Sequence, residues 1–197
     1  DLRNPLAIIQ TIIENMFLTM DEKLHSELIS KKQILDKSFE RINHQLNDVL
    51  DFVSIRRTNF KKIPFQELLK NTLNMINIPN QATIKFPKDN PEINCDDAQM
   101  VVVFNNLISN AAQKMGDKCK IDIQYDSDDI WHIIKVIDYG EPIPDDILPK
   151  IFEPLFTTKQ KGIGLGLASC KIIVEIHGGI IFAENNPVTF TIKIPKN

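Results

Sequence analysis

A glycine-rich segment is the first feature of the sequence whose residue types could do chemistry. Gly162, Gly164 and Gly166 alternate with aliphatic residues, and a helical pattern begins at Leu167. Glycines let a backbone approach a ligand closely, and a helix N-terminus offers free N–H groups and a positive dipole end to a phosphate. The segment alone also fits an ordinary turn. Because no Gly-Lys-Ser or Gly-Lys-Thr follows, it is not a P-loop.

Two further groups of polar residues could bind a nucleotide. Asp138 follows a strand-like run and precedes Gly140 by two positions. A carboxylate there can accept a hydrogen bond from the exocyclic amine of a base, and Gly140 would let the base come close. Asn106 and Asn110 lie one helical turn apart on one face, and amide oxygens suit Mg²⁺ and the water around phosphates. Taken singly, these residues fit a capped turn and surface asparagines equally well.

The N-terminal third of the chain has the composition of long helices. Residues 6–63 contain neither glycine nor proline, so the stretch can be helical throughout. A single rod of this length would extend ~87 Å, and we expect instead a two-helix hairpin that turns within residues 19–26.

The apolar residues of this hairpin form two regular seams. In each helix they are separated by alternating steps of four and three, which is the spacing of packed, coiled helices. The first seam is Leu2, Leu6, Ile9, Ile13, Met16 and Met20, and the second is Leu35, Phe39, Ile42, Leu46, Val49 and Val53. A lone hairpin cannot enclose its own core, so we expect a homodimer that forms a four-helix bundle. Packing of the hairpin on the rest of its own chain is the alternative.

The remainder of the chain mixes helices and strands. Residues 56–62 are polar and basic, as in a linker. Periodicity then predicts helices at 65–75, 98–115 and 167–177. It predicts strands at 83–86, 92–95, 120–125, 130–137, 180–184 and 189–194, with a proline-rich loop over 141–165. The fold class is therefore α+β.

The order of these segments resembles the sequence boxes of sensor histidine kinases. The asparagine helix, Asp138–Gly140, Phe152–Lys159 and Gly162–Gly166 are similar to the N, first glycine, F and second glycine boxes. The resemblance continues through residues 177–179. Residues 1–6 resemble the H-box without its first letter, so the likeness covers essentially the whole chain.

This resemblance implies a domain organisation and an activity. Residues 1–55 would be the dimerisation and phosphotransfer hairpin, 56–62 the linker, and 63–197 an ATP-binding α/β sandwich of the GHKL (Bergerat) type. The protein would bind ATP with Mg²⁺ and transfer the γ-phosphoryl group to a histidine and then to an aspartate of a response-regulator receiver domain. It would work as a homodimer in the cytoplasm, alone or as the cytoplasmic part of a membrane-anchored sensor.

The resemblance also assigns roles to individual residues. Asn110 would hold Mg²⁺ and Asn106 would lie in the phosphate site. Asp138 would bind the adenine amine, and Gly140 would shape the adenine pocket. The remaining cofactor-binding residues implied are Lys114, Phe152, Phe156, Thr157, Thr158, Lys159, Lys161, Gly162, Gly164, Gly166 and Leu167, most of them in a lid over the phosphates. For Lys159 and Lys161, solvated lysines are the alternative.

The implied catalytic residues lie at the start of the chain. The acceptor histidine would stand immediately before Asp1, which would act as its general base. Asn4, one helical turn after that histidine, would orient water for a phosphatase reaction on the partner regulator. The sequence departs from the family pattern at Pro142, where a glycine is usual, and at Gln113, where a basic residue is usual and Lys114 follows.

Composition excludes several other classes of protein. Hydrophobic residues make up 43% and charged residues 25%, and the formal net charge is −3, so we expect a folded protein that binds no nucleic acid and has no membrane segment in this chain. Three widely spaced cysteines do not suggest a disulfide framework or a zinc site. Two rival functions remain, a GHKL ATPase that acts as a conformational clamp and a degenerate nucleotide-binding scaffold that transfers no phosphate.

Overall fold

A computed structural model describes residues 58–196 except for 77–78, 80 and 160–162, together with residues 9, 11–13, 15, 34–36, 38–39 and 42. The described residues between 9 and 42 are all helical, as expected. The predicted turn at 19–26 lies outside the described residues, and the hairpin and its dimer stay predictions. Within the described part of the chain, no helix is both long enough and apolar enough to cross a membrane.

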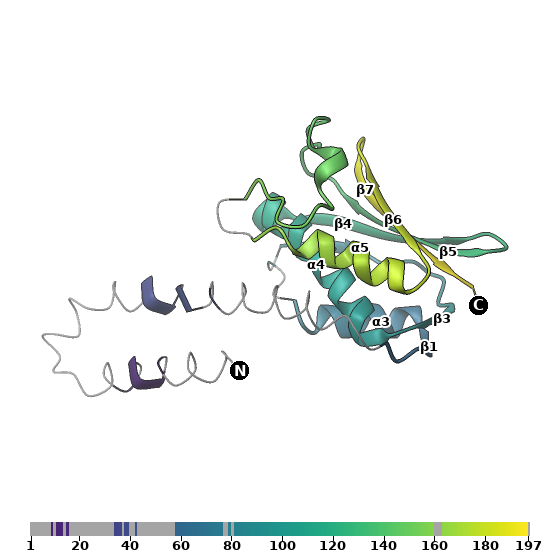
Figure 1. The fold of residues 1–197 in the computed structure, drawn as a ribbon, viewed down its shortest axis with the longest axis horizontal. Coiled ribbons are helices and arrows are strands. Elements are labelled where there is room, and N and C mark those ends of the chain that lie inside the picture. Colours follow the sequence, from purple (N-terminus) through teal and green to yellow (C-terminus); the bar gives the residue numbers. More distant parts are fainter. Residues whose placement is uncertain are drawn as a thin grey trace, which may run out of the picture.

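The part of the chain from residue 58 onward is built on a five-stranded mixed sheet (Figure 1). Its strand order is β2-β4-β5-β7-β6, and only the β2–β4 pair is parallel. The central β5 pairs along its whole length, with Asp138 opposite Ile121 of β4 and Val188 of β7. The strands are β2 (Thr83–Lys85), β4 (Lys120–Ser127), β5 (Trp131–Asp138), β6 (Ile180–Glu184) and β7 (Val188–Pro195).

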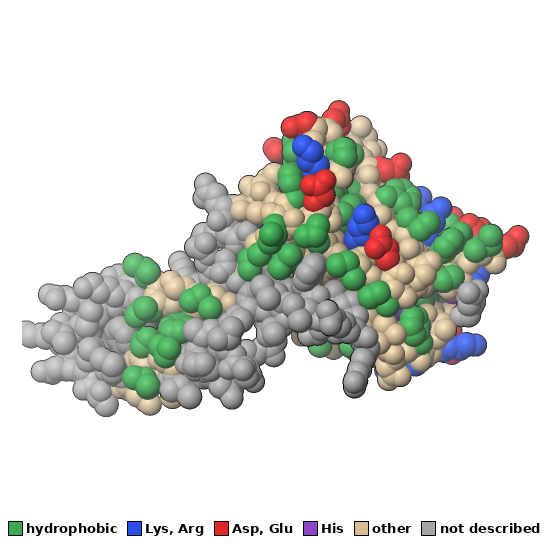
Figure 2. Space-filling view, in the orientation of Figure 1, with side chains coloured by type: hydrophobic (Ala, Val, Ile, Leu, Met, Phe, Trp, Pro, Cys, Tyr) green, Lys and Arg blue, Asp and Glu red, His purple; other side chains and the backbone are tan. Residues whose placement is uncertain are grey.

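Three helices cover one face of this sheet (Figure 1). They are α3 (Phe65–Leu73), α4 (Asp97–Met115) and α5 (Gly166–Ile176). One short 3-10 turn follows α4 at Gly116–Lys118, and another lies at Leu148–Lys150 in the loop between β5 and α5. A small second sheet pairs β1 (Lys61–Pro64) with β3 (Glu92–Cys95) in antiparallel register. The charged side chains of both signs are interspersed over the visible surface (Figure 2).

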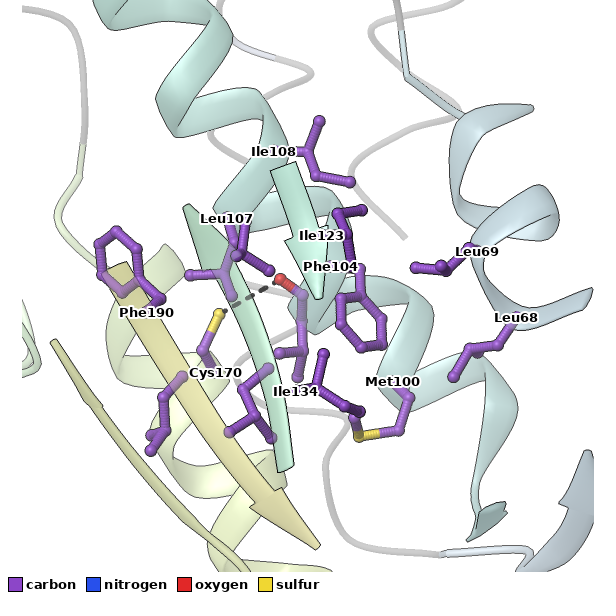
Figure 3. Close-up of a cluster of buried hydrophobic side chains, with 14 of the residues drawn as sticks. Leu68, Leu69, Met100, Phe104, Leu107, Ile108, Ile123, Ile134, Cys170 and Phe190 are labelled. Carbon is purple, nitrogen blue, oxygen red and sulfur yellow. Dashed lines mark hydrogen bonds between the residues drawn. The ribbon is translucent and has the colours of Figure 1, made fainter. Parts of the chain in front are cut away.

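The hydrophobic core lies between the helices and the sheet. In Figure 3, Phe104 and Leu107 of α4 and Cys170 of α5 pack with Ile134 and Phe190 from the strands. These side chains are no more than 6% exposed. Each fully buried Leu, Ile or Phe stabilises the fold by roughly 1.5–3 kcal/mol, so the core holds α4 and α5 firmly on the sheet.

The predicted elements are confirmed with shifts of no more than two residues at most ends. α3 ends at Leu73, and β4 and β7 extend slightly beyond their predicted runs. The part of the expected linker at Lys61 and Lys62 lies in β1, where the strand is completed by pairing with β3. Only Ile63 of β1 is buried, so the local pattern had no alternating apolar face to reveal it.

Candidate functional site

Helix α4 carries both asparagines and is fixed at its two ends. Asp96 caps its start, where Oδ1 accepts a hydrogen bond from the backbone N–H of Gln99 at 3.0 Å. Gly116 ends it with φ +66°, a left-handed conformation that favours glycine. The buried face of α4 packs on the core, which leaves Asn106 and Asn110 half-buried on another side.

Asn106 lies directly against the first residue of α5. A Cβ atom built on Gly166 would lie only 2.7 Å from Asn106 Oδ1, so no larger residue fits without displacing that side chain. The N-cap of α5 is Leu165, whose side chain offers no acceptor. The first N–H groups of α5 are therefore available to an anion next to Asn106.

Asp138 ends β5 as a buried carboxylate. The residue is only 4% exposed. Its Oδ1 accepts a hydrogen bond from the N–H of Gly140 at 2.8 Å. A Cβ on Gly140 would lie 2.9 Å from the same oxygen, so a larger residue there would have to displace the Asp138 side chain. Lys114, in the last turn of α4, lies beside this carboxylate. Its Nζ is 3.8 Å from Asp138 Oδ1 and donates to the carbonyl oxygen of Glu141. The lysine is thus placed beside the carboxylate rather than beside Asn110.

The segment Ile151–Lys159, which we call the lid segment, is anchored at its aromatic side chains. Phe152 and Phe156 pack against the core, and the ring of Phe152 meets Phe190 edge-on with centroids 6.4 Å apart. The N–H of Leu155 donates to the carbonyl of Gly164 at 3.0 Å. Gly164 has φ +77°, and a Cβ there would lie 2.5 Å from the carbonyl oxygen of Phe156.

The end of the lid segment reaches across to α4. Thr157 and Thr158 are exposed, and Thr157 Oγ1 accepts from the N–H of Lys159 at 3.1 Å. Lys159 Nζ donates to Asn110 Oδ1 at 2.6 Å and to Gln113 Oε1 at 2.8 Å. Two amide oxygens one turn apart therefore hold a cationic group. Amide oxygens are also ligands that Mg²⁺ accepts, so the donor set at Asn110 fits a hard cation.

The structure shows where most of the predicted site residues lie, while their roles stay predictions. Asn106 of α4 lies against the first residue of α5, and Asn110 is on the same side of α4. Asp138 ends β5 and Gly140 follows it, and Leu167 packs against the core. The predicted residues Asp1, Asn4, Lys161 and Gly162 lie outside the described residues.

One residue that the sequence did not single out fixes the loop after Gly140. Asn185 Oδ1 accepts from the N–H of Ile143 at 2.9 Å, and its Nδ2 donates to the carbonyl of Ile143 at 2.8 Å. The Asn-Asn-Pro run between β6 and β7 signals a turn. That turn signal does not reveal that the side chain of Asn185 holds the loop at Ile143, 42 residues earlier in the chain.

Two titratable groups near Asp138 are held in their neutral forms. Burial, with a smaller contribution from the Asp138 charge, raises the pKa of the Cys119 thiol. The hydroxyl of Tyr139 donates to Asp122 Oδ2 at 2.8 Å, which raises the pKa of Tyr139. Neither group is a nucleophile at neutral pH, so the described residues near Asp138 are suited to binding a ligand rather than to attacking it.

Comparison with known proteins assigns part of the chain to a protein family. Residues 95–197 match the family model described as histidine kinase-, DNA gyrase B-, and HSP90-like ATPase. The chain belongs to this ATPase family. The matched residues begin at the last residue of β3 and contain all of α4, the lid segment and α5.

Two curated relatives of this chain are named as kinases, one of them as a histidine-protein kinase. Sporulation kinase A of Bacillus subtilis is 34% identical over 100% of this chain and 33% of its own length. The signal transduction histidine-protein kinase AtoS of Escherichia coli is 31% identical, with the same coverage of both proteins. The chain thus spans about a third of the length of these curated relatives.

Solved structures of histidine kinases also share the fold. The catalytic domain of histidine kinase ThkA is 32% identical, with a TM-score of 0.61, and covers 70% of this chain and 96% of its own. Histidine kinase ThkA in complex with response regulator protein TrrA is 28% identical, with a TM-score of 0.69, and covers 99% of this chain and 58% of its own.

Proposed function

We propose that this chain is the catalytic core of a two-component sensor histidine kinase, which binds Mg²⁺-ATP and transfers its γ-phosphoryl group to a histidine. One observation carries the proposal: a buried carboxylate at the end of β5 and a cation-holding pair of amides on α4 belong to the same family-matched half of the chain. Relatives named as histidine kinases, AtoS and ZraS of Escherichia coli, align over the whole chain, which favours a kinase over a clamp ATPase.

Asp138 would select the base of the nucleotide. Its buried carboxylate can accept a hydrogen bond from the exocyclic amine of adenine, whereas guanine presents a carbonyl oxygen at that position. Two acceptors would then face each other in a buried site, which costs the full desolvation of an unpaired group. Gly140 keeps the approach to this carboxylate narrow and free of a side chain.

The side of α4 that carries Asn106 and the N-terminus of α5 would bind the phosphates. Asn106 and the N-terminus of α5 present amide groups to an anion, and Asn110 would supply an oxygen to Mg²⁺. When bound, Mg²⁺ neutralises phosphate charge. The chain's own residues would contribute position and charge, which is the main requirement of phosphoryl transfer.

The N-terminal residues would supply the acceptor and the dimer. We propose residues 1–55 as a dimerisation and phosphotransfer hairpin, 56–62 as a linker and 63–197 as the ATP-binding domain. The seam residues Ile9, Leu35 and Ile42 are 46%, 38% and 40% exposed, whereas Phe39 of the second seam is 8% exposed. A second copy that forms a four-helix bundle would cover the exposed ones.

The phosphoryl group would pass through a histidine immediately before Asp1, with Asp1 as the general base, to an aspartate of a response regulator. The ThkA complex with a response regulator, similar to this chain over nearly its whole length, supports a partner of this class. Asn4 would orient water for dephosphorylation of that partner. We place the reaction in the cytoplasm, where such receiver domains would meet the kinase.

A labelling experiment tests the proposal. A chain extended upstream by its natural residues should, with Mg²⁺-ATP, gain an acid-labile, alkali-stable phosphate on the histidine before Asp1. Asp1→Ala should slow labelling without loss of nucleotide binding, since Asp1 precedes the ATP-binding domain. The 197-residue chain should bind ATP and stay unlabelled. Labelling of His25 or His44 in that chain would show that the acceptor is assigned wrongly, and nucleotide binding without any labelling of the extended chain would favour a scaffold.

A further inference from the structure

Lys159 makes a contact that the proposed phosphate site does not account for. Its ammonium group bridges Asn110 Oδ1 and Gln113 Oε1, at 2.6 and 2.8 Å, although both partners are more than 45 residues away in the sequence. Asn110 and Gln113 are three residues apart on α4 and so project from neighbouring positions of one helix face. The two oxygens form a receptor for a cation, and the lid segment itself provides one.

The backbone around Lys159 aims its side chain at this receptor. Thr157 Oγ1 accepts from the N–H of Lys159 and makes a tight turn at the end of the lid segment. The earlier part of the segment is tied down by the pairing of Leu155 with Gly164 and by the packing of Phe156. The lysine bridge therefore joins an anchored segment to the helix that carries the proposed Mg²⁺ ligand.

We propose that Lys159 is a latch that occupies the Asn110 oxygen in the nucleotide-free protein and is displaced when Mg²⁺-nucleotide binds. An ammonium group 2.6 Å from an oxygen cannot remain there when a divalent cation takes the same oxygen, because like charges at contact distance repel strongly. Metal binding would thus free the end of the lid segment from α4. The identity of the displacing ligand rests on the proposed function, whereas the latch in the free protein does not.

Hydrogen exchange of the nucleotide-free chain tests the latch directly. Lys159→Met removes the charge but keeps the length of the side chain, and exchange in a peptide covering residues 151–159 should become on the order of threefold to tenfold faster. Asn110→Ala should have a similar effect. The double variant should exchange no faster than Lys159→Met, because that substitution already removes the contact that Asn110→Ala would weaken.

The matched control is Lys171→Met on α5. Lys171 is half-exposed and pairs only loosely with Glu175, at 4.0 Å, so its loss should leave exchange in the lid segment unchanged. A thermal melt of each variant verifies that the fold is intact. Wild-type exchange in Lys159→Met, or strictly additive effects of the two single substitutions, would overturn the latch.

A calorimetric titration with ADP tests the displacement. The gain in affinity from Mg²⁺, measured as the ratio of Kd in EDTA to Kd in excess Mg²⁺, should be on the order of threefold to tenfold larger in Lys159→Met than in the wild type, since the metal no longer has to displace an ammonium. An equal or smaller gain would refute the displacement. If the wild type binds no ADP in either condition, the proposed function fails, while the exchange experiment still decides the latch.

Discussion

The contact between Gly166 and Asn106 makes Gly166→Ala a sharp test of the proposed phosphate site. The added Cβ would lie 2.7 Å from Asn106 Oδ1 and 3.3 Å from its Cγ, so the asparagine side chain must move. Alanine is the better helix former by roughly 0.5–1 kcal/mol, and Gly166 does not have the positive φ that would make alanine strained. The substitution should therefore disturb the site while leaving the fold intact.

The two consequences can be measured separately. The gain in helix propensity and the cost of moving one half-buried side chain nearly cancel, so we expect the melting temperature to change by no more than about 4 °C. Affinity for Mg²⁺-ADP should fall about tenfold, equivalent to about 1.4 kcal/mol, because Asn106 and the start of α5 no longer hold their relative positions. Calorimetric titration and a thermal melt give the two values.

Lys171→Ala is the control for this experiment, because it changes an exposed residue of the same helix. It should alter neither the affinity nor the melting temperature appreciably. If Gly166→Ala binds Mg²⁺-ADP as tightly as the wild type, the site is not formed between Asn106 and the start of α5. A fall in melting temperature much beyond 4 °C would show instead that the close approach of α5 to α4 is chiefly structural.

Three other predictions concern single residues. ATP should compete on the order of a hundredfold better than GTP for the site, and Asp138→Asn should narrow this preference because an amide can also donate; equal competition in the wild type would exclude Asp138 as the base contact. Asn110→Ala should weaken Mg²⁺-ADP binding about tenfold in calorimetry while the thermal melt is unchanged, and an unaltered affinity would remove it from the metal site. Burial, with Lys196 adding to it, lowers the pKa of His132, so the folded protein favours neutral imidazole and its stability should fall as pH drops below about 6.5. The free energy of unfolding of His132→Gln, measured by denaturant titration, should depend less on pH in this range. Parallel plots of unfolding free energy against pH for the variant and the wild type would contradict the assignment.

Local sequence signals located most of the helices and strands of residues 63–197. Asp96 and Gly116 mark the ends of α4, and alternating residues mark β4 and β5, because capping and periodicity are local properties of the backbone. The Asp138–Gly140 turn and the glycine at the start of α5 were found for the same reason, since each depends on the conformation of its own few residues. β1 was missed because its charged residues and proline form a strand only when β3 pairs with them.

The sequence by itself determined which residue types are available for a nucleotide site and on which elements they lie. Tertiary structure decided how they meet: Asn106 touches Gly166, Lys159 bridges Asn110 and Gln113, and Lys114 turns to Asp138 instead of to the other end of the site. These pairs join elements far apart in the chain, and their contacts depend on how the apolar faces of α4 and α5 pack on one sheet. Periodicity states which face of each helix is buried, but the packed core sets the distance and rotation between the helices, and those bring the polar groups together.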